Sequence, residues 1–185
     1  MLKGEKVVLR PVKRSDINHF LRWFNDPEVI QYLLLYLPLT EIAEEKWIED
    51  LSVRIGAGTA AVFVIEVLDD NKSIGTIGFH GINPKDHNAE FGIAIGEKSH
   101  WGKGYGTEAT RLILDYGFRQ LNLHRIGSSA FSFNERSIKL HKAVGFHEEG
   151  CQREAIFKNG EFHDMVMFGL LRDEWRNNLT EEIGK

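Results

Sequence analysis

Glycines are concentrated in the middle of this chain, and their placement limits the possible folds more than any other feature of the sequence. Eight of the 18 glycines lie in the 32 residues from Gly75 to Gly106. Because a glycine has no side chain, such a cluster indicates bulges and close approach of one backbone to another or to a ligand. We therefore expect the chemistry of the protein in this part of the chain.

The first 60 residues show the apolar period of helices, after a strand predicted over residues 6–10. Ser15 and Thr40 are the expected N-caps of two helices. Their apolar faces comprise Ile17, Phe20, Leu21 and Phe24 in the first helix and Trp47, Leu51 and Ile55 in the second. Asp26-Pro27 is expected to end or bend the first helix. The apolar segment from Gln31 to Leu39 then either packs on the core or forms the wall or lid of a substrate pocket.

From residue 60 the apolar pattern changes to the two-residue period of strands. The predicted strands span residues 61–68, 73–82, 89–95 and 125–131. Polar turns separate the first three, which indicates an antiparallel meander, whereas a glycine-rich loop and a helix precede the fourth and complete a parallel βαβ unit. A helix over residues 134–144, which Gly145 ends, and two strands around the Asn159-Gly160 turn follow.

Length and composition support one domain over residues 1–185, of the α/β class in its α+β form, with a mixed and mostly antiparallel central sheet. Apolar residues make up 42% of the chain and charged residues 27%, a balance typical of globular proteins. The net charge of −4 gives no electrostatic footprint for nucleic acid or an anionic membrane, and it suits a cationic substrate better. The longest apolar run, Tyr32 to Leu37, is too short to span a membrane, and Met1 to Arg14 is too polar for a secretory signal, so we expect a cytoplasmic protein.

The cysteine and histidine content argues against a disulfide or a metal site. Cys151 is the single cysteine, which excludes an internal disulfide. The eight histidines are scattered and show no zinc-ligand spacing. We therefore expect no metal.

The segment from Ser99 to Ala109, SHWGKGYGTEA, follows a predicted strand and opens a predicted helix. At such a junction free N–H groups and the positive end of the helix dipole meet, and glycines let a phosphate reach the backbone. Three alternate glycines exceed what a tight turn requires. The loop therefore predicts a phosphate site, with a purely structural glycine turn as the alternative.

The residues around these glycines restrict the kind of phosphate. A Walker A loop is excluded because five residues rather than four separate Gly96 from Gly102, and glycine follows Lys103 where Ser or Thr would bind magnesium. A G-x-G-x-x-A fingerprint for dinucleotides begins at Gly104, but the acidic residue expected about 20 positions later is missing. A pyrophosphate without a nicotinamide ribose remains, and coenzyme A carries one.

Polar residues lie on the inward face of the predicted helix over residues 134–144. Asn134, Ser137 and His141 recur at i, i+3 and i+7, opposite an outward charged face of Glu135, Arg136, Lys139 and Lys142. Buried polar groups require partners, because each unsatisfied one costs roughly 1–3 kcal/mol. Two interpretations are open. In one, a bound ligand supplies these partners. In the other, Asn134 caps the helix, and Ser137 and His141 bond to nearby backbone.

Further motifs lie in a fixed order along nearly the whole chain. They are Leu9-Arg-Pro, Ala89-Glu90-Phe91-Gly92, Gly102-Lys-Gly104-Tyr-Gly106-Thr-Glu-Ala, Asn134-x-x-Ser137-Ile-x-Leu-His141-x-x-x-Gly145-Phe146, Glu149-Gly150, Gly160 and His163-Asp164. In this order and spacing the sequence resembles the GNAT N-acetyltransferases, and more narrowly the RimJ/RimL branch that acetylates the amino termini of ribosomal proteins and related amines. The resemblance implies a GNAT-like sheet with helices on both faces, acetyl-CoA as cosubstrate and an amine as partner. The amine could be a polyamine or a protein N-terminus, and the resemblance also allows a homodimer.

The resemblance implies a role for each part of the cofactor site. The backbone of the glycine loop would hold the pyrophosphate of acetyl-CoA, and the strand edge at Phe91 to Ile95 would pair with the pantetheine amides. Asn134 would hold the pantetheine arm, and Ser137 would lie near the thioester sulfur. Trp101 stands where many family members have Gln or Arg. The implied cofactor-binding residues are Ile93, Ala94, Ile95, Trp101, Gly102, Lys103, Gly104, Tyr105, Gly106, Thr107, Asn134 and Ser137.

Catalysis would require a base, because only a neutral amine attacks a thioester and the pKa is about 10.4 for an alkylamine and about 8 for an α-amine. Glu90 is the first candidate, and Asp164 with His163 is the second. Ser137 or His141 is the candidate donor of a proton to the departing thiolate; His141 stands where many members of the family have a tyrosine donor. We therefore predict an acetyl-CoA-dependent N-acetyltransferase that acts by direct attack in a ternary complex. A catalytically silent acyl-CoA-binding module is the alternative.

Overall fold

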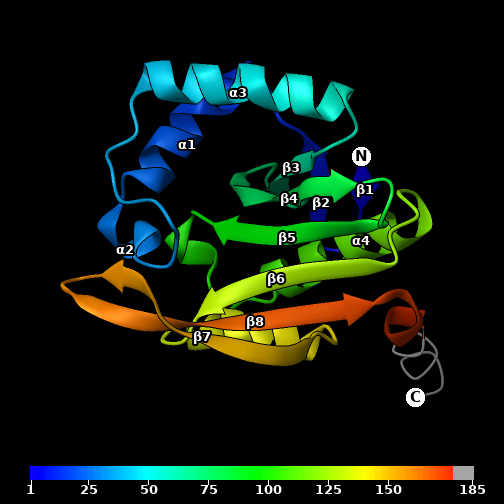
Figure 1. Ribbon diagram of the computed structural model, residues 1–185. Helices are drawn as coiled ribbons and strands as arrows, with labels where there is room; N and C mark the ends of the chain where they lie inside the picture. Colours follow the sequence, from blue (N-terminus) through cyan, green and yellow to red (C-terminus); the bar gives the residue numbers. More distant parts are fainter. Residues whose placement is uncertain (177–185) are drawn as a thin grey trace.

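The computed structural model describes residues 1–176 and shows in them a sheet of eight strands in the order β1-β2-β3-β4-β5-β6-β8-β7 (Figure 1). Neighbouring strands are antiparallel except β5 and β6, which are parallel. The strands are β1 (Leu2–Lys3), β2 (Val7–Pro11), β3 (Ala61–Val67), β4 (Ser73–Asn83), β5 (Asn88–Ile95), β6 (Arg125–Phe131), β7 (His147–Lys158) and β8 (Glu161–Leu171). The predicted mixed α/β fold is confirmed. Residues 177–185 of the predicted domain lie outside the described residues.

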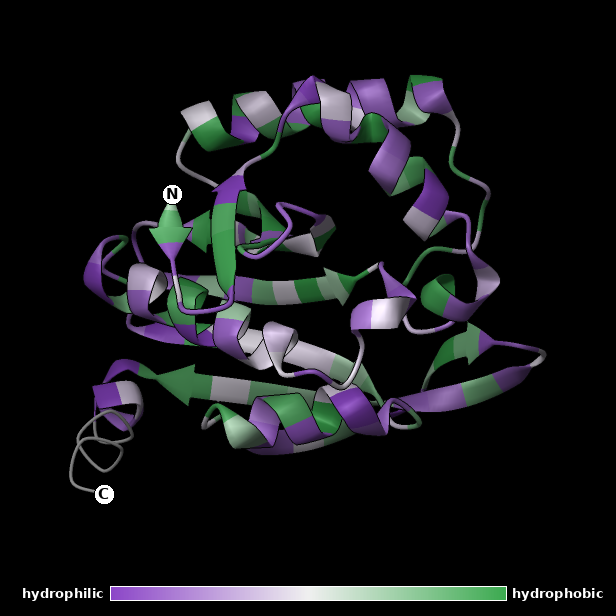
Figure 2. Cartoon of the chain, turned by 180° about the vertical axis from the view of Figure 1, so that it is seen from behind, coloured by the Kyte–Doolittle hydropathy of each residue, from purple (hydrophilic) through white to green (hydrophobic). Residues whose placement is uncertain are grey.

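Helices cover both faces of the sheet, as expected (Figure 1). They are α1 (Ile17–Phe24), α2 (Pro27–Ile30), α3 (Glu41–Gly56), α4 (Tyr105–Arg119) and α5 (Glu135–Ala143), with 3₁₀ turns at Arg14–Asp16 and Lys98–His100. Ile113 of α4 packs into the cluster on one face, and Phe20 of α1 packs with Val64 of β3 on the other. Because β3 is buried on both faces, its sequence is almost continuously apolar. The exposed helix α3 instead alternates apolar and polar bands (Figure 2).

Within residues 1–176, no helix combines the length and the apolar character needed to cross a membrane. The longest one, α3, has 16 residues, and its charged residues Glu41, Lys46, Glu49 and Asp50 are exposed. A membrane-spanning helix needs about 20 predominantly apolar residues.

One of the two expected N-caps in the first 60 residues is confirmed, and the other is wrong. Thr40 caps α3, and its Oγ1 accepts a hydrogen bond from the Ala43 N–H at 3.2 Å. Ser15 lies inside the 3₁₀ turn, and Asp16 takes the cap position of α1. The physical reason is the ion pair of Asp16 with Arg10, which fixes this carboxylate at the start of the helix.

Of two further local expectations, the first is confirmed and the second is wrong. Asp26-Pro27 ends α1 but also begins α2, because the Asp26 carboxylate accepts the Glu28 N–H at 2.9 Å and proline is favourable in a first helical turn. Ile55 is not buried with the rest of the apolar face of α3: it is 45% exposed. The apolar cluster under this helix contains Leu51 and does not extend to Ile55.

The parallel strands β5 and β6 separate soon after they meet, and this geometry positions the site. Their paired residues are Asn88 with Arg125, Ala89 with Ile126 and Glu90 with Gly127. Beyond these pairs β5 continues along β4 to Ile95, whereas β6 continues along β8 to Phe131. Figure 1 shows the two strands diverging toward their C-terminal ends. We call the space between residues 91–95 and 128–131 the wedge. Ligands of α/β sheets commonly bind outside the C-terminal ends of such strands.

A buried ion-pair network joins α1 to the first strands. Arg10 of β2 donates to both carboxylate oxygens of Asp16, at 2.9 and 2.7 Å, and its Nε donates to Glu66 at 2.7 Å. A further hydrogen bond from Arg10 reaches Ser73 Oγ on β4 at 2.8 Å. Burial raises the pKa of Asp16, but the hydrogen bonds from Arg10 and from the Lys13 N–H outweigh it, so the pKa lies below its ordinary value.

We predict that Asp16→Asn lowers the free energy of unfolding by about 3 kcal/mol at neutral pH, because Arg10 then remains buried without its counter-ion. The depressed pKa of Asp16 means that its contribution is present above the ordinary carboxyl pKa and is lost as the pH falls through the depressed value. The difference between wild type and variant should therefore shrink in acid. Urea denaturation across this pH range is the measurement.

The matched control is Glu49→Gln, which removes an exposed ion pair with Arg14 whose side chains are 66% and 68% exposed. Exposed pairs contribute little, so no change is expected. An equal loss in both variants, or no loss in Asp16→Asn, would contradict the account.

Candidate active site

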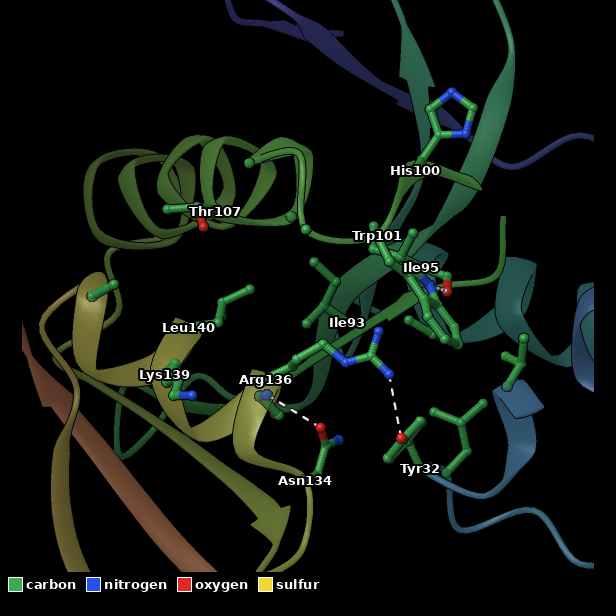
Figure 3. Close-up of a pocket in the computed structure, with 18 residues that line it drawn as sticks. Tyr32, Ile93, Ile95, His100, Trp101, Thr107, Asn134, Arg136, Lys139 and Leu140 are labelled. Carbon is green, nitrogen blue, oxygen red and sulfur yellow. Dashed lines mark hydrogen bonds between the residues drawn. The ribbon is translucent and has the colours of Figure 1, made fainter. Parts of the chain in front are cut away.

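A cavity of about 440 Å³ lies between β5, the loop before α4, α5 and α2 (Figure 3). This volume is within the range of small-molecule sites, roughly 300–1,000 Å³. Its wall contains ten of the twelve residues predicted to bind the cofactor, namely Ile93, Ala94, Ile95, Trp101, Gly102, Gly104, Gly106, Thr107, Asn134 and Ser137. The other two are outside the wall. Lys103 is exposed, and the Tyr105 ring packs on His100, with 5.5 Å between ring centroids.

The loop before α4 presents N–H groups to this cavity. Gly102 and Gly104 have φ angles of +73° and +85°, which favour glycine, and a Cβ at either position would meet no atom within 4 Å. A hydrogen bond from the Glu108 N–H to the Gly104 carbonyl, at 3.1 Å, begins the helix. Within residues 1–176, the N–H groups from Tyr105 to Thr107 therefore have no backbone partner. Three such groups at the positive end of a helix dipole fit a pyrophosphate.

β5 presents a free backbone edge to the wedge beyond its last pair with β6. The Phe91 carbonyl accepts a hydrogen bond from Ser128 Oγ at 3.1 Å, and the Ile95 carbonyl accepts one from Trp101 Nε1 at 2.7 Å. Both carbonyls therefore point away from β4. Alternate residues of a strand direct their N–H and C=O groups to the same side, so those of Ile93 also point into the wedge. Such an edge can pair with the amides of an extended ligand.

Arg136 bridges the cavity, in a position that the sequence did not predict (Figure 3). From the first turn of α5 its guanidinium lies 4.2 Å from the centroid of the Trp101 ring and 5.2 Å from that of Tyr32. Its Nη2 donates to the Tyr32 hydroxyl at 3.3 Å. The helical period placed Arg136 on the charged outward face. Tyr32 and Leu33 also line the cavity. They belong to the apolar segment from Gln31 to Leu39, for which the wall of a substrate pocket was one of the two interpretations.

Ser137 and His141 both lie on α5, but of the two Ser137 lines the cavity and His141 does not. The His141 ring is 2% exposed and stacks on Phe168 with 4.6 Å between centroids. Its Nδ1 lies 2.7 Å from the Ser137 carbonyl oxygen, and its Nε2 lies 2.8 Å from Ser128 Oγ. A carbonyl only accepts, so Nδ1 carries the proton, and Nε2 and the Phe91 carbonyl are alternative acceptors of the single Ser128 hydroxyl proton. Burial lowers the pKa of His141, although the bond to Ser137 opposes it, and the ring is neutral at neutral pH.

Glu90 lies where β5 and β6 separate, and it does not line the cavity. Its neighbours Ala89 and Phe91 belong to the cluster under α4, so the alternation of the strand places the Glu90 side chain on the opposite face of the sheet. The residue is exposed on its outer side, but its carboxylate lies against the backbone of Gly127. This partial burial raises the pKa of Glu90; Arg125 opposes the shift and Glu149 adds to it. A carboxylate with a raised pKa is a stronger base.

Asp164 is not close to Glu90. Glu90 is paired with Gly127 of β6, and Gly127 is paired with Gly169 of β8. Asp164 lies five residues along β8 from Gly169, a separation of roughly 17 Å. Its Oδ1 accepts the N–H of Glu154 at 2.8 Å, within the irregular part of β7. The His163 ring packs on Phe133, with 4.6 Å between centroids. The structure therefore brings Ser137 and the cofactor residues together and places Glu90 at the end of the wedge. Asp164 instead lies in the hairpin formed by β7 and β8.

The sequence matches the acetyltransferase (GNAT) domain family over residues 6–147. This chain belongs to the GNAT acetyltransferase family. Acetyl-CoA is the cosubstrate of these enzymes, and the loop, the strand edge and the cavity described above fit it. The chain is an acetyl-CoA-dependent N-acetyltransferase, and the alternative of a catalytically silent module is set aside. Within residues 1–176, no group of three or more His, Cys, Asp or Glu side chains could hold a metal ion.

Relatives of this acetyltransferase include enzymes that act on different acceptors. The uncharacterized N-acetyltransferase p20 of Bacillus licheniformis is 35% identical over 94% of this chain and 97% of its own. A spermidine N-acetyltransferase from Vibrio cholerae, solved in complex with CoA and spermine, is 27% identical over 94% of this chain and 100% of its own, with a TM-score of 0.86. The ribosomal-protein-S5-alanine acetyltransferase of Vibrio fischeri is 25% identical over 94% of this chain and 97% of its own, with a TM-score of 0.83.

We predict that Gly104→Val weakens CoA binding by at least about tenfold, that is about 1.4 kcal/mol, because a branched side chain obstructs the approach of a phosphate to the loop. Isothermal calorimetry with CoA is the measurement. Valine at a positive φ also strains the backbone, and the control must contain the same strain.

Gly58→Val provides that control, since Gly58 has a φ of +71° and open space around it, far from the cavity wall. It should lose a similar amount of stability and keep the affinity of the wild type for CoA. Equal affinities in the two variants would mean that the glycines of the loop serve only the turn.

Proposed function

We propose that this acetyltransferase transfers the acetyl group of acetyl-CoA to a primary amine by direct attack in a ternary complex. The observation that carries the proposal is the wedge between β5 and β6. The N–H groups that fit a pyrophosphate lie at its open end, and Glu90 lies at its closed end. An extended cosubstrate along the free edge of β5 would direct its reactive end toward Glu90.

The chain's own groups supply the binding contacts. The N–H groups from Tyr105 to Thr107 would hold the pyrophosphate, and the backbone of Ile93 would pair with a pantetheine amide. The Asn134 side chain accepts the Ser137 N–H through Oδ1 at 3.2 Å. Its NH₂ group therefore remains to donate to the pantetheine arm, as the family resemblance implied. Arg136, Trp101 and Tyr32 would enclose this arm from the outer side.

Acetyl-CoA supplies an acetyl group activated as a thioester, and the protein moves the protons. Glu90 accepts a proton from the bound ammonium and so frees the neutral amine that attacks the thioester carbonyl, because its raised pKa suits that role. As the new C–N bond forms and the C–S bond breaks, the Ser137 hydroxyl donates a proton to the sulfur and regains one from the nitrogen, which loses its second proton as it becomes an amide. We assign this donor role to Ser137 and not to His141, because Ser137 lines the cavity and His141 is packed beneath it. His141 instead fixes Ser137 through its carbonyl.

The acceptor class is a small or terminal primary amine. Names of relatives point to two candidates, a polyamine and the N-terminal alanine of a ribosomal protein. Both are cations at neutral pH, which fits the net charge of −4 and the free carboxylate of Glu90. The test is a panel of spermidine, spermine and an alanyl-terminated peptide with acetyl-CoA, read by release of free thiol. Thiol release that depends on the amine supports the proposal. CoA binding without acetylation of any amine in the panel would contradict it.

We predict that Glu90→Gln lowers kcat by roughly 10²–10⁴-fold while CoA affinity stays nearly unchanged, because the variant loses its proton acceptor and not a cofactor contact. In wild type the rate should fall as the pH drops through the raised pKa of Glu90, since only the ionised carboxylate accepts a proton. The variant should lack this limb of the pH–rate profile. Steady-state kinetics across pH is the measurement.

Glu5→Gln is the matched control, because Glu5 is exposed in the turn between β1 and β2. This variant should leave the pH–rate profile unchanged. Ser137→Ala should lower kcat more than it weakens CoA binding. Full activity of Glu90→Gln across the pH range would remove Glu90 from the mechanism and favour a route from an already neutral α-amine.

A further inference from the structure

Two glycines form a flat floor beneath the Glu90 side chain. Gly127 of β6 is paired with Glu90 on one side and with Gly169 of β8 on the other. A Cβ on Gly127 would lie 2.5 Å from Glu90 Oε1, and a Cβ on Gly169 would collide with Glu149 and lie 2.6 Å from Arg125 Nη1. Any side chain larger than glycine at these two positions would therefore displace the charged groups above them. We call Gly127 and Gly169 the glycine floor.

Three charged side chains from three strands lie on the glycine floor. Arg125 of β6 donates to both carboxylate oxygens of Glu149 on β7, with Nη1 to Oε1 at 2.6 Å and a second bond from Nη2 to Oε2. This ion pair is bidentate, which fixes the guanidinium in one orientation. Because Arg125 and Glu149 neutralise each other, the group carries one net negative charge, and Glu90 provides it.

The groups that surround Glu90 come from each neighbouring strand. His80 on β4 is paired directly with Glu90, and burial and the charge of Arg54 lower its pKa, so His80 is neutral at neutral pH. Arg125 favours the ionised form of Glu90 and Glu149 opposes it. Behind them, His147 acts on Glu149 and Glu174 acts on Arg125. Burial is the largest influence on the pKa of Glu90, and Arg125 and Glu149 are the charges that act on it in opposite directions.

We propose that Arg125 and Glu149 are positioning residues for Glu90: their ion pair, seated on the glycine floor, holds the Glu90 carboxylate beside the reacting amine and sets how readily it takes a proton. The inference rests on the proposed function, in which Glu90 is the base. An arginine alone would keep Glu90 ionised and make it a weak base. Glu149 offsets this effect and leaves a carboxylate that is held in place but still basic.

The test is a pair of neutral substitutions with opposite expected effects. In Arg125→Gln the charge of Glu149 is no longer compensated, so Glu90 should hold its proton to a higher pH. In Glu149→Gln the charge of Arg125 is no longer compensated, so Glu90 should lose its proton at a lower pH. The acid limb of kcat/KM against pH should move up in the first variant and down in the second, each by roughly one pH unit. Arg125→Lys keeps the positive charge and should stay near wild type in this respect.

A second readout does not depend on turnover. The Glu90 carboxyl resonance, assigned by its absence in Glu90→Gln, can be titrated by ¹³C NMR in the full chain and should shift in the same two directions. Asp115→Asn removes a surface ion pair with Arg119, 2.7 Å long, and serves as the control that leaves both readouts unchanged.

Opposite shifts in the two variants support the proposal. Unchanged midpoints, or shifts in the same direction, overturn it. If no amine is acetylated but the NMR titration moves in the two expected directions, the proposed function fails while the positioning of Glu90 stands. If amines are acetylated and neither the profile nor the titration moves, the positioning proposal fails and the proposed function stands.

Discussion

The backbone hydrogen bonds between β5 and β6 end at Glu90 and Gly127, and every other part of the site depends on this early end. A parallel pair that continued would have used the N–H and C=O groups of β5 on β6. Because it does not continue, these groups are left on the edge of the cavity, where an extended ligand with amides of its own can pair with them. The same separation leaves room for α5 to contribute Asn134 and Ser137 to the wall.

Where β5 and β6 separate, side-chain contacts take the place of backbone hydrogen bonds between the two strands. Ser128 bonds to the Phe91 carbonyl, and His141 packs beneath it between aromatic rings. The Ser128 hydroxyl has two acceptors within reach, the Phe91 carbonyl and His141 Nε2, so polar partners remain where the strands separate. On the other face of the sheet the same point carries the charges of Glu90, Arg125 and Glu149. Cofactor groups and proton-accepting groups are thus separated by the sheet and meet at the end of the wedge.

The sequence predicts those parts of the site that local chemistry determines. The glycines at 102 and 104 stand at a strand–helix junction and adopt positive φ, and Asn134 caps α5, as their types and positions indicate. It does not predict contacts between distant segments. Arg136 was placed on the outward face of its helix, yet it meets Tyr32, which lies 104 residues earlier. Ser15 fails as a cap because the partner of Asp16, Arg10, belongs to a strand. Such errors arise where a tertiary ion pair or ring contact outweighs a local preference.

We infer that acetyl-CoA lies along the free edge of β5 with its pyrophosphate on the loop before α4. Amide hydrogen exchange resolved by NMR, with and without CoA, tests it most directly. CoA should slow exchange at the N–H groups of Ile93 and of Tyr105 to Thr107, and NADH at the same concentration should not. Unchanged exchange at these amides in saturating CoA, or equal protection by NADH, would contradict it.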